Sequence, residues 1–452
     1  GHTTSYTYDD NFNVTAVTDP LGRTTQFTWN DSACSFSSIE DAMGHTTTLS
    51  YDARNNLLAI TDPLGRSTHF GYAAGDTLAA ITNTLGAVTT FTYDAYGQMT
   101  ASTNARGDTT ATEYDLYGNL TAITDALGHT THLSYDLTGR PTAITDANGH
   151  TTTFLYDAGD NLLAVTNPLS GTTAFAYDLA GNLTSVTDAN GHTLALAYDA
   201  AGRLITMTDA LQGQTVFAYD AAGRVIRVTD ANGRATHFGY DGAGRPVTVT
   251  DALNGQTRYV YDAAGNVISV TDPTNATTTF QYDALDRTVA ITDALGHATW
   301  FGYNAVGNVV AALDPTGMLI QYTYDALDRP LSVTVLGVGQ VAAYAYDPAG
   351  NLTAVTDANG RVTQYGYDAL NRLAQVSDPL SHVTSYGYDP VGNLSAVTDA
   401  NTHTRTYGYD ALNRLAAASN PLGHTTAYGY DAVGNTTVIT DADGLATHYA
   451  YD

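Results

Sequence analysis

A tyrosine, nearly always followed by aspartate, recurs every 21 residues along this 452-residue chain. One inserted residue shifts the series before Tyr346, and Tyr8 and Trp29 extend it toward the N-terminal end, which makes 22 copies. A fixed period of this length is typical of repeat architectures, in which each unit packs mainly on its neighbours. We therefore expect one continuous array over residues 1–452, with a degenerate repeat at residues 30–41.

Each repeat predicts two short strands joined by two tight turns. In one copy, residues 172–177 are rich in threonine and aromatic residues, and residues 183–187 form a second β-type segment. The fourth residue after the tyrosine is Gly, Asn or Asp in 19 copies, as expected for the left-handed residue that closes a three-residue hairpin loop. The left-handed positions that we assign are Gly118, Gly181, Gly223, Gly265, Gly350 and Asn371.

The second link of the repeat reads Asp-Pro-Leu-Gly at residues 62–65, which is the pattern of a type I turn. Two tight turns per repeat require antiparallel neighbours, because parallel strands need longer connections. We predict an all-β fold of tandem hairpins that form one antiparallel ribbon of about 44 strands. Open sheets of more than about ten strands curl or split, so the ribbon should spiral into a hollow tube or shell. A two-sided β-solenoid is the alternative.

Alternation along the strands predicts one bulky face and one small face. A three-residue loop would place Tyr177 opposite Leu183 and Phe175 opposite Ser185, with Val186 on the other face. Stacked copies should then form a double aromatic ladder, in which each cross-strand pair contributes roughly 0.2–1 kcal/mol. The ladder tyrosines are Tyr93, Tyr114, Tyr135, Tyr156, Tyr177, Tyr198, Tyr219, Tyr240, Tyr261 and Tyr282.

The hairpin loops alternate between two sequences from about residue 283 onward. Asp-Ala-Leu-Asp-Arg at residues 283–287 is followed by Asn-Ala-Val-Gly-Asn at 304–308, and related pairs continue with a period of 42 residues. The alternation records either a duplication of paired units or two alternating environments along the ribbon.

The charge of the chain excludes some partners. The formal net charge is −28, with 45 acidic residues, nearly all Asp, and 17 basic residues, all Arg. Nucleic acids and anionic membrane surfaces attract basic patches, so neither is an expected partner. No apolar run approaches the roughly 20 residues that span a bilayer, so no membrane insertion is expected. Cys34 is the single cysteine, which precludes an internal disulfide, and its degenerate surroundings give no reason to expect catalysis there.

Two polar columns could be binding sites or turn residues. Aspartates follow the tyrosine, as Asp94 does, or the threonine, as Asp125 does. Stacked carboxylates could chelate calcium, but each Asp also suits an Asx-turn, which we favour, so no cofactor is expected. A column of Gly-His pairs suggests a zinc or proton-sensing ladder. Because Arg takes the same slot at Arg66, we expect solvent-facing turn residues, no metal site and no catalytic residues.

The repeat resembles the YD repeat of the Rhs family. The unit Tyr-Ala-Tyr-Asp-Pro-Ala-Gly-Asn-Leu-Thr-Ala-Val-Thr-Asp-Ala-Asn-Gly at residues 344–360 carries the resemblance, which extends over essentially the whole chain. Members are large secreted or surface proteins, mostly bacterial, with teneurins as animal relatives. The resemblance implies a ribbon that spirals into a shell, which in Rhs toxins encloses a C-terminal toxin. The family's self-cleaving core is missing; Asp-Pro-Thr-Gly at residues 314–317 is similar to its motif but lies mid-array, where we expect a type I turn.

Two functions from different classes follow. The first is a non-catalytic extracellular structural or interaction protein: a tube, fibre or shell at or beyond the bacterial cell surface. The alternative is the encapsulating shell segment of an Rhs-type polymorphic toxin, whose toxin domain lies outside this chain. The expected partners are further copies or a continuation of the same polypeptide, of which this chain would be an excised portion, and in the alternative an enclosed toxin.

Overall fold

A computed structural model describes residues 3–30 and 35–451, and these residues form 43 β-strands in one sheet. Each strand pairs antiparallel with the strands before and after it, from the β1–β2 pair to the β42–β43 pair. The sheet is therefore an open ribbon of consecutive hairpins, and the predicted all-β antiparallel fold is confirmed. Because the described residues form no helix, none of them offers a helical membrane span.

The strands fall into two series. The odd-numbered strands, most of which end at the repeated tyrosine, are β1 Ser5–Tyr8, β3 Thr24–Asn30, β5 Thr46–Tyr51, β7 Ser67–Tyr72, β9 Val88–Tyr93, β11 Thr109–Tyr114, β13 Thr130–Tyr135, β15 Thr151–Tyr156, β17 Thr172–Tyr177, β19 Thr193–Tyr198, β21 Gln214–Tyr219, β23 Ala235–Tyr240, β25 Gln256–Tyr261, β27 Thr277–Tyr282, β29 Ala298–Tyr303, β31 Leu319–Tyr324, β33 Gly339–Tyr346, β35 Val362–Tyr367, β37 Val383–Tyr388, β39 Thr404–Tyr409, β41 Thr425–Tyr430 and β43 Ala446–His448. The even-numbered strands are β2 Val14–Thr18, β4 Ser35–Glu40, β6 Leu57–Thr61, β8 Leu78–Thr82, β10 Met99–Thr103, β12 Leu120–Thr124, β14 Pro141–Thr145, β16 Leu162–Thr166, β18 Leu183–Thr187, β20 Leu204–Thr208, β22 Val225–Thr229, β24 Pro246–Thr250, β26 Val267–Thr271, β28 Thr288–Thr292, β30 Val309–Leu313, β32 Pro330–Val335, β34 Leu352–Asp357, β36 Leu373–Ser377, β38 Leu394–Thr398, β40 Leu415–Ser419 and β42 Thr436–Thr440. Cys34 and part of the predicted degenerate repeat lie outside the described residues, and β4 continues the series beyond them.

Two kinds of turn lie on the two long edges of the ribbon. We call the loop after each tyrosine a Y-turn, as at residues 178–182, and the turn after each even-numbered strand a T-turn, as at 188–192. In this Y-turn the Asp178 N–H donates to Asn182 O at 2.9 Å, and the Gly181 N–H donates to Asp178 O at 3.1 Å. These two bonds define a three-residue hairpin loop closed by a residue with positive φ. The Y-turns form the Y-edge of the ribbon and the T-turns form its T-edge.

The third loop residue of the Y-turn has positive φ at each left-handed position assigned from the sequence. The φ angles are 87° at Gly118, 84° at Gly181, 84° at Gly223, 97° at Gly265, 91° at Gly350 and 57° at Asn371. This conformation costs a residue with a Cβ roughly 1–2 kcal/mol of conformational free energy, and the cost is smallest for Asn.

Replacing Gly223 tests this backbone requirement. A Cβ at Gly223 would meet no atom within 4 Å, so any loss of stability comes from the φ angle alone. We expect Gly223→Val to lower the free energy of unfolding by about 1–2 kcal/mol. Gly223→Asn is the matched control and should cost much less, because Asn371 has this conformation in the same slot. Equal losses in urea unfolding would contradict the assignment.

The register corrects one expectation about the two faces. Tyr177 lies opposite Leu183 as predicted, but Phe175 pairs with Val186 instead of Ser185. A β-bulge between these pairs adds one residue to the even-numbered strand, which brings Val186 onto the same face as Phe175 and Tyr177. The same register shift recurs along the array. In some repeats a proline such as Pro246 takes the position of Leu183, because at the bulge this residue does not have to donate an N–H to the neighbouring strand.

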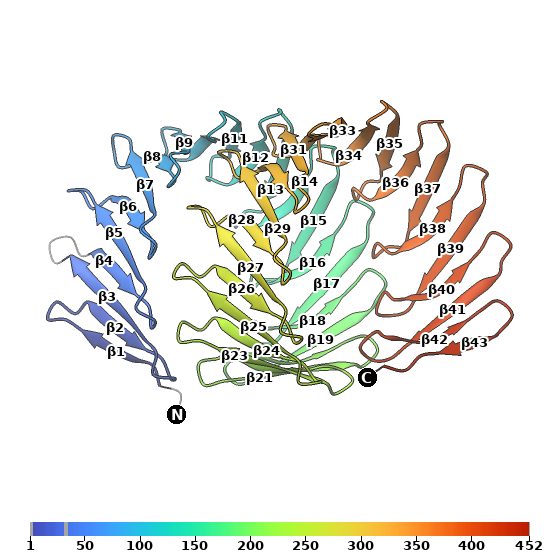
Figure 1. The fold of residues 1–452 in the computed structure, drawn as a ribbon, viewed down its shortest axis with the longest axis horizontal. Coiled ribbons are helices and arrows are strands. Elements are labelled where there is room, and N and C mark those ends of the chain that lie inside the picture. Colours follow the sequence, from blue (N-terminus) through green and yellow to red (C-terminus); the bar gives the residue numbers. More distant parts are fainter. Residues whose placement is uncertain (1–2, 31–34, 452) are drawn as a thin grey trace.

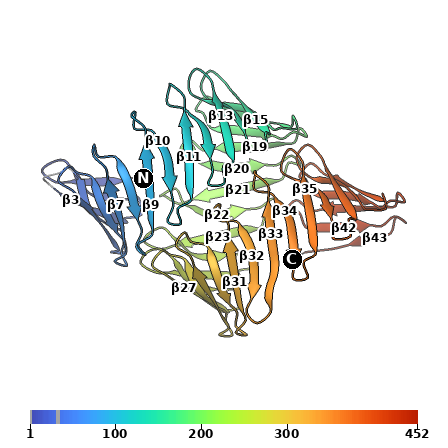
Figure 2. The ribbon, with the colours of Figure 1, turned by 90° about the horizontal axis from the view of Figure 1, so that it is seen from above.

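The ribbon coils on itself (Figure 1). It rises through β1–β9, descends through β15–β19, rises again through β25–β29 and descends through β37–β43. Seen from above, β9–β15 and β27–β33 cross the view on opposite sides (Figure 2). Hydrogen bonds join residues 199–225 positions apart, and 452 residues hold about two such intervals. We call residues 3–234 the first tier and residues 235–451 the second tier.

Candidate functional site

The repeated tyrosine forms a ladder of hydroxyl-to-carbonyl hydrogen bonds. Tyr198 Oη donates to Leu183 O at 2.9 Å, and this carbonyl belongs to the bulge of the preceding repeat. The same bond is made 15 residues back at Tyr177, Tyr219, Tyr240, Tyr261 and Tyr282, and in later repeats through Tyr430. Across the inserted residue, Tyr346 donates to Pro330 O, 16 residues back. The hydroxyl therefore satisfies a carbonyl near a break in the strand ladder.

Variant repeats use the same acceptor. Trp29 Nε1 donates to Val14 O at 2.7 Å in place of a tyrosine hydroxyl. In another repeat the Thr112 hydroxyl donates to Met99 O, the carbonyl that lies 15 residues before Tyr114. The tyrosine slot holds Tyr or Trp in every copy and never Phe. This choice is the sequence signal for a hydrogen-bond donor, and the predicted aromatic ladder did not include it. Tyr93, Tyr114, Tyr135 and Tyr156 are the last residues of β9, β11, β13 and β15.

In part of the array, arginine lies over tyrosine in place of the expected contacts between aromatic rings. Among the described residues, ring pairs occur where Phe36 contacts Phe27 and Trp29. In eight repeats the guanidinium at the end of a Y-turn lies over the tyrosine ring of the next repeat; Arg224 lies 4.4 Å from the ring centroid of Tyr240. Successive tyrosines are two strand spacings apart, about 9–10 Å, so their rings do not stack directly.

The aspartates of both columns close turns. Asp178 Oδ1 accepts the N–H groups of Ala180 and Asn182, and its Oδ2 accepts the Asn182 side-chain amide at 2.9 Å. The side-chain bond from Asn182, followed by the backbone bonds, lowers the pKa of Asp178. At Asp241 burial raises the pKa, but the hydrogen bonds and charge of Arg245 outweigh it and lower the pKa overall. These carboxylates are thus ionised turn residues.

The histidine column occupies the last position of the T-turn. The His129 ring Nδ1 lies 2.9 Å from Asp125 Oδ2 and the His403 Nδ1 lies 3.2 Å from Asp399 Oδ2. Asp62 pairs with Arg66 in the same geometry, so the slot accepts either side chain. The expected solvent-facing position holds for His403 but not for His129, whose side chain is only 23% exposed. Within residues 3–30 and 35–451, no group of three or more His, Cys, Asp or Glu side chains is arranged to hold a metal ion.

The two tiers contact each other through their turns. T-turns of the first tier lie against Y-turns of the second. Asn232 Nδ2 donates to Asp431 Oδ2 at 3.0 Å. Burial raises the pKa of Asp431, but the hydrogen bonds from Asn435 and Asn232 outweigh it and lower the pKa to about 2. Arg66 donates to Asp286 Oδ1 and Oδ2 at 2.7 and 2.9 Å. This interface, which joins residues about 200 positions apart, was not predicted from the sequence.

Removing Arg66 should loosen the tier contact. Its side chain is 13% exposed and its partner Asp286 is 44% exposed. We expect Arg66→Ala to lower the free energy of unfolding by about 2 kcal/mol, the low end for a hydrogen-bonded charge pair, because Asp286 remains partly hydrated. Arg361→Ala is the control, since Arg361 pairs with Asp357 in an equivalent T-turn outside the contact and is 65% exposed. The control should cost less than about 0.5 kcal/mol, and equal losses in urea unfolding would refute the difference.

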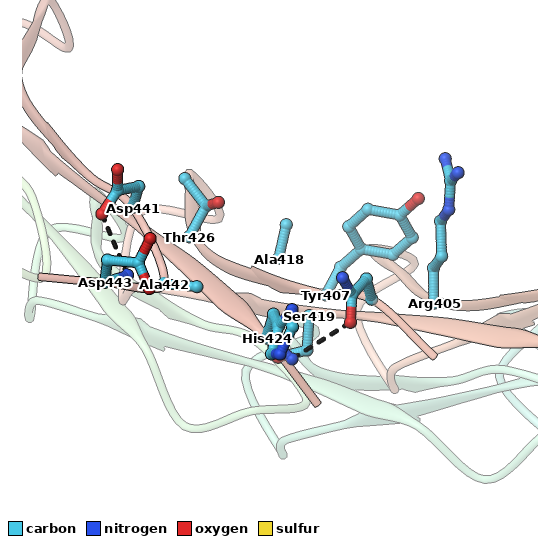
Figure 3. Close-up of a pocket in the computed structure, with 10 residues that line it drawn as sticks. Arg405, Tyr407, Ala418, Ser419, His424, Thr426, Asp441, Ala442 and Asp443 are labelled. Carbon is cyan, nitrogen blue, oxygen red and sulfur yellow. Dashed lines mark hydrogen bonds between the residues drawn. The ribbon is translucent and has the colours of Figure 1, made fainter. Parts of the chain in front are cut away.

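One open pocket lies near the free T-edge of the second tier (Figure 3). It has a volume of about 440 Å³ and is lined by residues of β39, β40 and the following turns, including Arg405, Tyr407 and His424. The Ser419 hydroxyl pairs with Thr425 Oγ1 at 2.6 Å, and the His424 N–H donates to Asn420 Oδ1. The hydroxyl of this serine thus makes a cross-strand contact, and the backbone of this histidine closes the turn.

Comparison with known families decides what kind of ribbon this is. A family model described as RHS Repeat matches residues 37–68, 51–77, 72–109, 114–151, 135–172, 303–337, 346–383, 388–426 and 430–452. A second model, described as Teneurin YD-shell, matches residues 169–319. The chain belongs to the RHS repeat family. No curated protein matches it in a sequence search.

Solved structures share the fold of this RHS ribbon. The crystal structure of TcdB2-TccC3 is 14% identical, with a TM-score of 0.64, and the match covers 99% of this chain and 34% of that one. A Photorhabdus luminescens Tc holotoxin pore is 15% identical, with a TM-score of 0.56, and the match covers 98% and 29%. The RHS ribbon thus spans about a third of the length of these chains. At this identity the likeness establishes the fold.

The alternating loops of the RHS ribbon make two complementary contacts. Arg287 ends one loop, and its Nη1 donates to Asn304 O of the next loop at 3.1 Å. Asn308 ends that next loop, and its Nδ2 donates to Asp328 Oδ1 of the following one at 2.6 Å. The two alternating loop sequences therefore make two alternating kinds of contact along the Y-edge. The Asp-Pro-Thr-Gly motif forms an ordinary turn, in which the Gly317 N–H donates to Asp314 O.

Proposed function

We propose that this chain is a non-catalytic scaffold that forms the wall of a hollow YD-repeat shell or tube outside a bacterial cell. The observation that carries the proposal is the contact between tiers. Hydrogen bonds such as those from Arg66 to Asp286 and from Asn232 to Asp431 join the T-edge of one tier to the Y-edge of the next. An edge-to-edge contact of this kind turns a ribbon into a continuous wall, whereas a fibre would leave its edges separate.

The chemistry of the chain also supports an architectural role. Its aspartates and tyrosines are used in turns and ladder contacts that repeat along the array, so no repeat is set apart for a reaction. The formal charge of −28 favours solubility and disfavours nucleic acid as a partner. The family and the shared fold are compatible with secretion or display at the cell surface.

The second candidate is an encapsulating segment that encloses a toxin domain carried elsewhere. The likeness in fold to TcdB2-TccC3 and to the Tc holotoxin pore favours this candidate. Under it, the wall would separate an enclosed protein from the surroundings until release.

Electron microscopy of the native assembly that contains this chain tests the proposal. Closed particles with internal density would support encapsulation, and tubes with a repeating axial rise would support a structural polymer. Isolated ribbons whose tiers do not touch would overturn the wall. Cell fractionation that recovers the protein only from the cytosol would overturn the extracellular location.

A further inference from the structure

We propose that three asparagines at the tier contact, Asn148, Asn190 and Asn232, are sites of spontaneous deamidation, that the contact slows this reaction, and that conversion loosens the contact. The only reagent is water, and the products are aspartate and isoaspartate. The inference goes beyond the architectural role proposed above. It rests on the contact between the tiers and does not depend on an enclosed cargo or on the location of the protein.

The three asparagines have the same place in their T-turns and the same kind of partner. Each is the third residue of an Asp-Ala-Asn-Gly turn, and the three are 42 residues apart. Their Nδ2 groups donate at 3.4, 3.4 and 3.0 Å to the Oδ2 atoms of Asp347, Asp389 and Asp431, which are also 42 residues apart. The asparagines therefore contact every second Y-turn of the covered edge from residue 347 onward.

The glycine after each asparagine makes this position reactive. Because glycine has no side chain, its backbone nitrogen approaches the Asn side-chain amide with the least steric hindrance. The nitrogen gives up its proton and attacks Cγ of the asparagine; a C–N bond forms, ammonia leaves, and a five-membered succinimide results. Water then opens the ring at either carbonyl and leaves a carboxylate, as aspartate or as isoaspartate. The reaction needs no oxidant or reductant.

The product reverses the electrostatics of the contact. The Asn232 amide is a donor to Asp431, and deamidation replaces this donor with a second carboxylate, which Asp431 repels. Asp431 does not readily take up a proton to relieve the repulsion, because the N–H groups of Val433 and Asn435 stabilise its charged form. Isoaspartate also lengthens the turn backbone by one methylene group.

Two turns of identical sequence separate the effect of the contact from that of the turn. Asp-Ala-Asn-Gly-Arg occurs at residues 230–234 on the covered T-edge and at 357–361 on the free T-edge. In both turns the Gly N–H donates to the Asp carbonyl at 2.9 Å, so the turn must open before the nitrogen attacks. The Asn232 side chain is bonded to Asp431, whereas the Asn359 side chain donates no hydrogen bond within the described residues.

Ageing the full chain in mildly alkaline buffer, well below its melting temperature, measures the reaction. Peptide mass mapping locates each conversion, and isoaspartyl methyltransferase labels isoaspartate. We expect Asn359 to convert first and Asn232 about two- to tenfold more slowly, which is the protection that one net hydrogen bond provides. Asn401 is the negative control, because Thr402 follows it in a turn of the free T-edge. Equal rates at Asn232 and Asn359 would overturn the proposal, and so would an Asn232 that converts no faster than Asn401.

Substitutions test the effect of conversion on the contact. The mimic variant carries Asn148→Asp, Asn190→Asp and Asn232→Asp, and the control carries Asn359→Asp. Hydrogen exchange at residues 347–351, 389–393 and 431–435 should be about two- to fivefold faster in the mimic, the size of an interaction between exposed charges. The control should leave exchange at these residues unchanged.

A swapped variant distinguishes repulsion from a general disturbance of the turns. It adds Asp347→Asn, Asp389→Asn and Asp431→Asn to the mimic, and Asn304 shows that asparagine closes a Y-turn. The swapped variant should exchange more slowly at the Y-turns than a chain with these three Asp→Asn substitutions alone, because donor and acceptor have exchanged places.

A mimic that is folded by circular dichroism and exchanges like the unaltered chain would overturn the proposal. If the triple mimic does not fold, Asn232→Asp and its swap with Asp431→Asn give the same comparison at residues 431–435. A cytosolic location or a fibre in microscopy would contradict the proposed function and leave this inference standing.

Discussion

Replacing Tyr198, Tyr219 and Tyr240 together with phenylalanine is expected to lower the free energy of unfolding by roughly 3–6 kcal/mol, or about 1–2 kcal/mol per hydroxyl. Each hydroxyl donates to a bulge carbonyl of the preceding repeat, at 2.9, 2.5 and 2.6 Å. Phenylalanine keeps the ring, which lies under Arg203 at Tyr219 and under Arg224 at Tyr240, but it leaves the carbonyl without this donor. Urea unfolding followed by circular dichroism measures the loss.

The matched control for this prediction uses tyrosines outside the ladder. Tyr96 and Tyr117 lie in Y-turns of the first tier and are 91% and 88% exposed. Tyr96→Phe with Tyr117→Phe should change the free energy of unfolding by less than about 0.5 kcal/mol, as surface substitutions usually do. If the ladder variant were as stable as this control, the tyrosines would act through packing and arginine contacts alone.

Acid is expected to unfold the ribbon as the pH falls from about 4 toward 2. Hydrogen bonds to the turn carboxylates lower the pKa of Asp178, Asp199, Asp241 and other aspartates of both columns below the unfolded value of 3.8. For a lowered pKa, the stabilisation is present above the unfolded pKa and is lost as the pH falls through the folded pKa. Because the motif repeats along the chain, the unfolded state takes up many protons in this window. Melting temperatures measured between pH 7 and pH 2 record the effect.

Asparagine in the same slot supplies the control for the acid effect. Asn304 Oδ1 accepts the N–H groups of Val306 and Asn308, so a neutral amide can close the turn. The combined substitutions Asp178→Asn, Asp199→Asn and Asp220→Asn should therefore make the melting temperature less dependent on pH below 4. A melting temperature that rises as the pH falls would mean that relief of the net charge of −28 outweighs the turn bonds.

Much of the local structure was predictable because its causes lie within one repeat. The Asp178–Asn182 loop follows from the Asp, the Gly at the third loop position and the residue spacing. The pairing of Tyr177 with Leu183 follows from that loop. The bulge beyond it was missed, since a one-residue insertion in a strand leaves no clear composition signal. That omission placed Val186 on the wrong face.

In the candidate site, too, the features with causes inside one repeat were predictable and the others were not. The position of the tyrosine slot was evident from the repeat, but the acceptor of its hydroxyl was not, because that carbonyl becomes available only where the bulge interrupts the ladder. Arginine over tyrosine was also missed. Arg224 and Tyr240 lie 16 residues apart in the sequence, and only the hairpin geometry brings the guanidinium over the ring.

The sequence by itself determined that this protein is a ribbon of antiparallel hairpins, because turn residues and strand lengths act over a few residues and repeat without interruption. Only the tertiary structure decided that the ribbon coils so that Arg66 meets Asp286, and which Y-turns and T-turns are covered. That offset depends on the twist and curvature summed over about ten repeats, so a small change in each hairpin would move the contact to different residues. The difference between a covered edge and a free edge arises at this level.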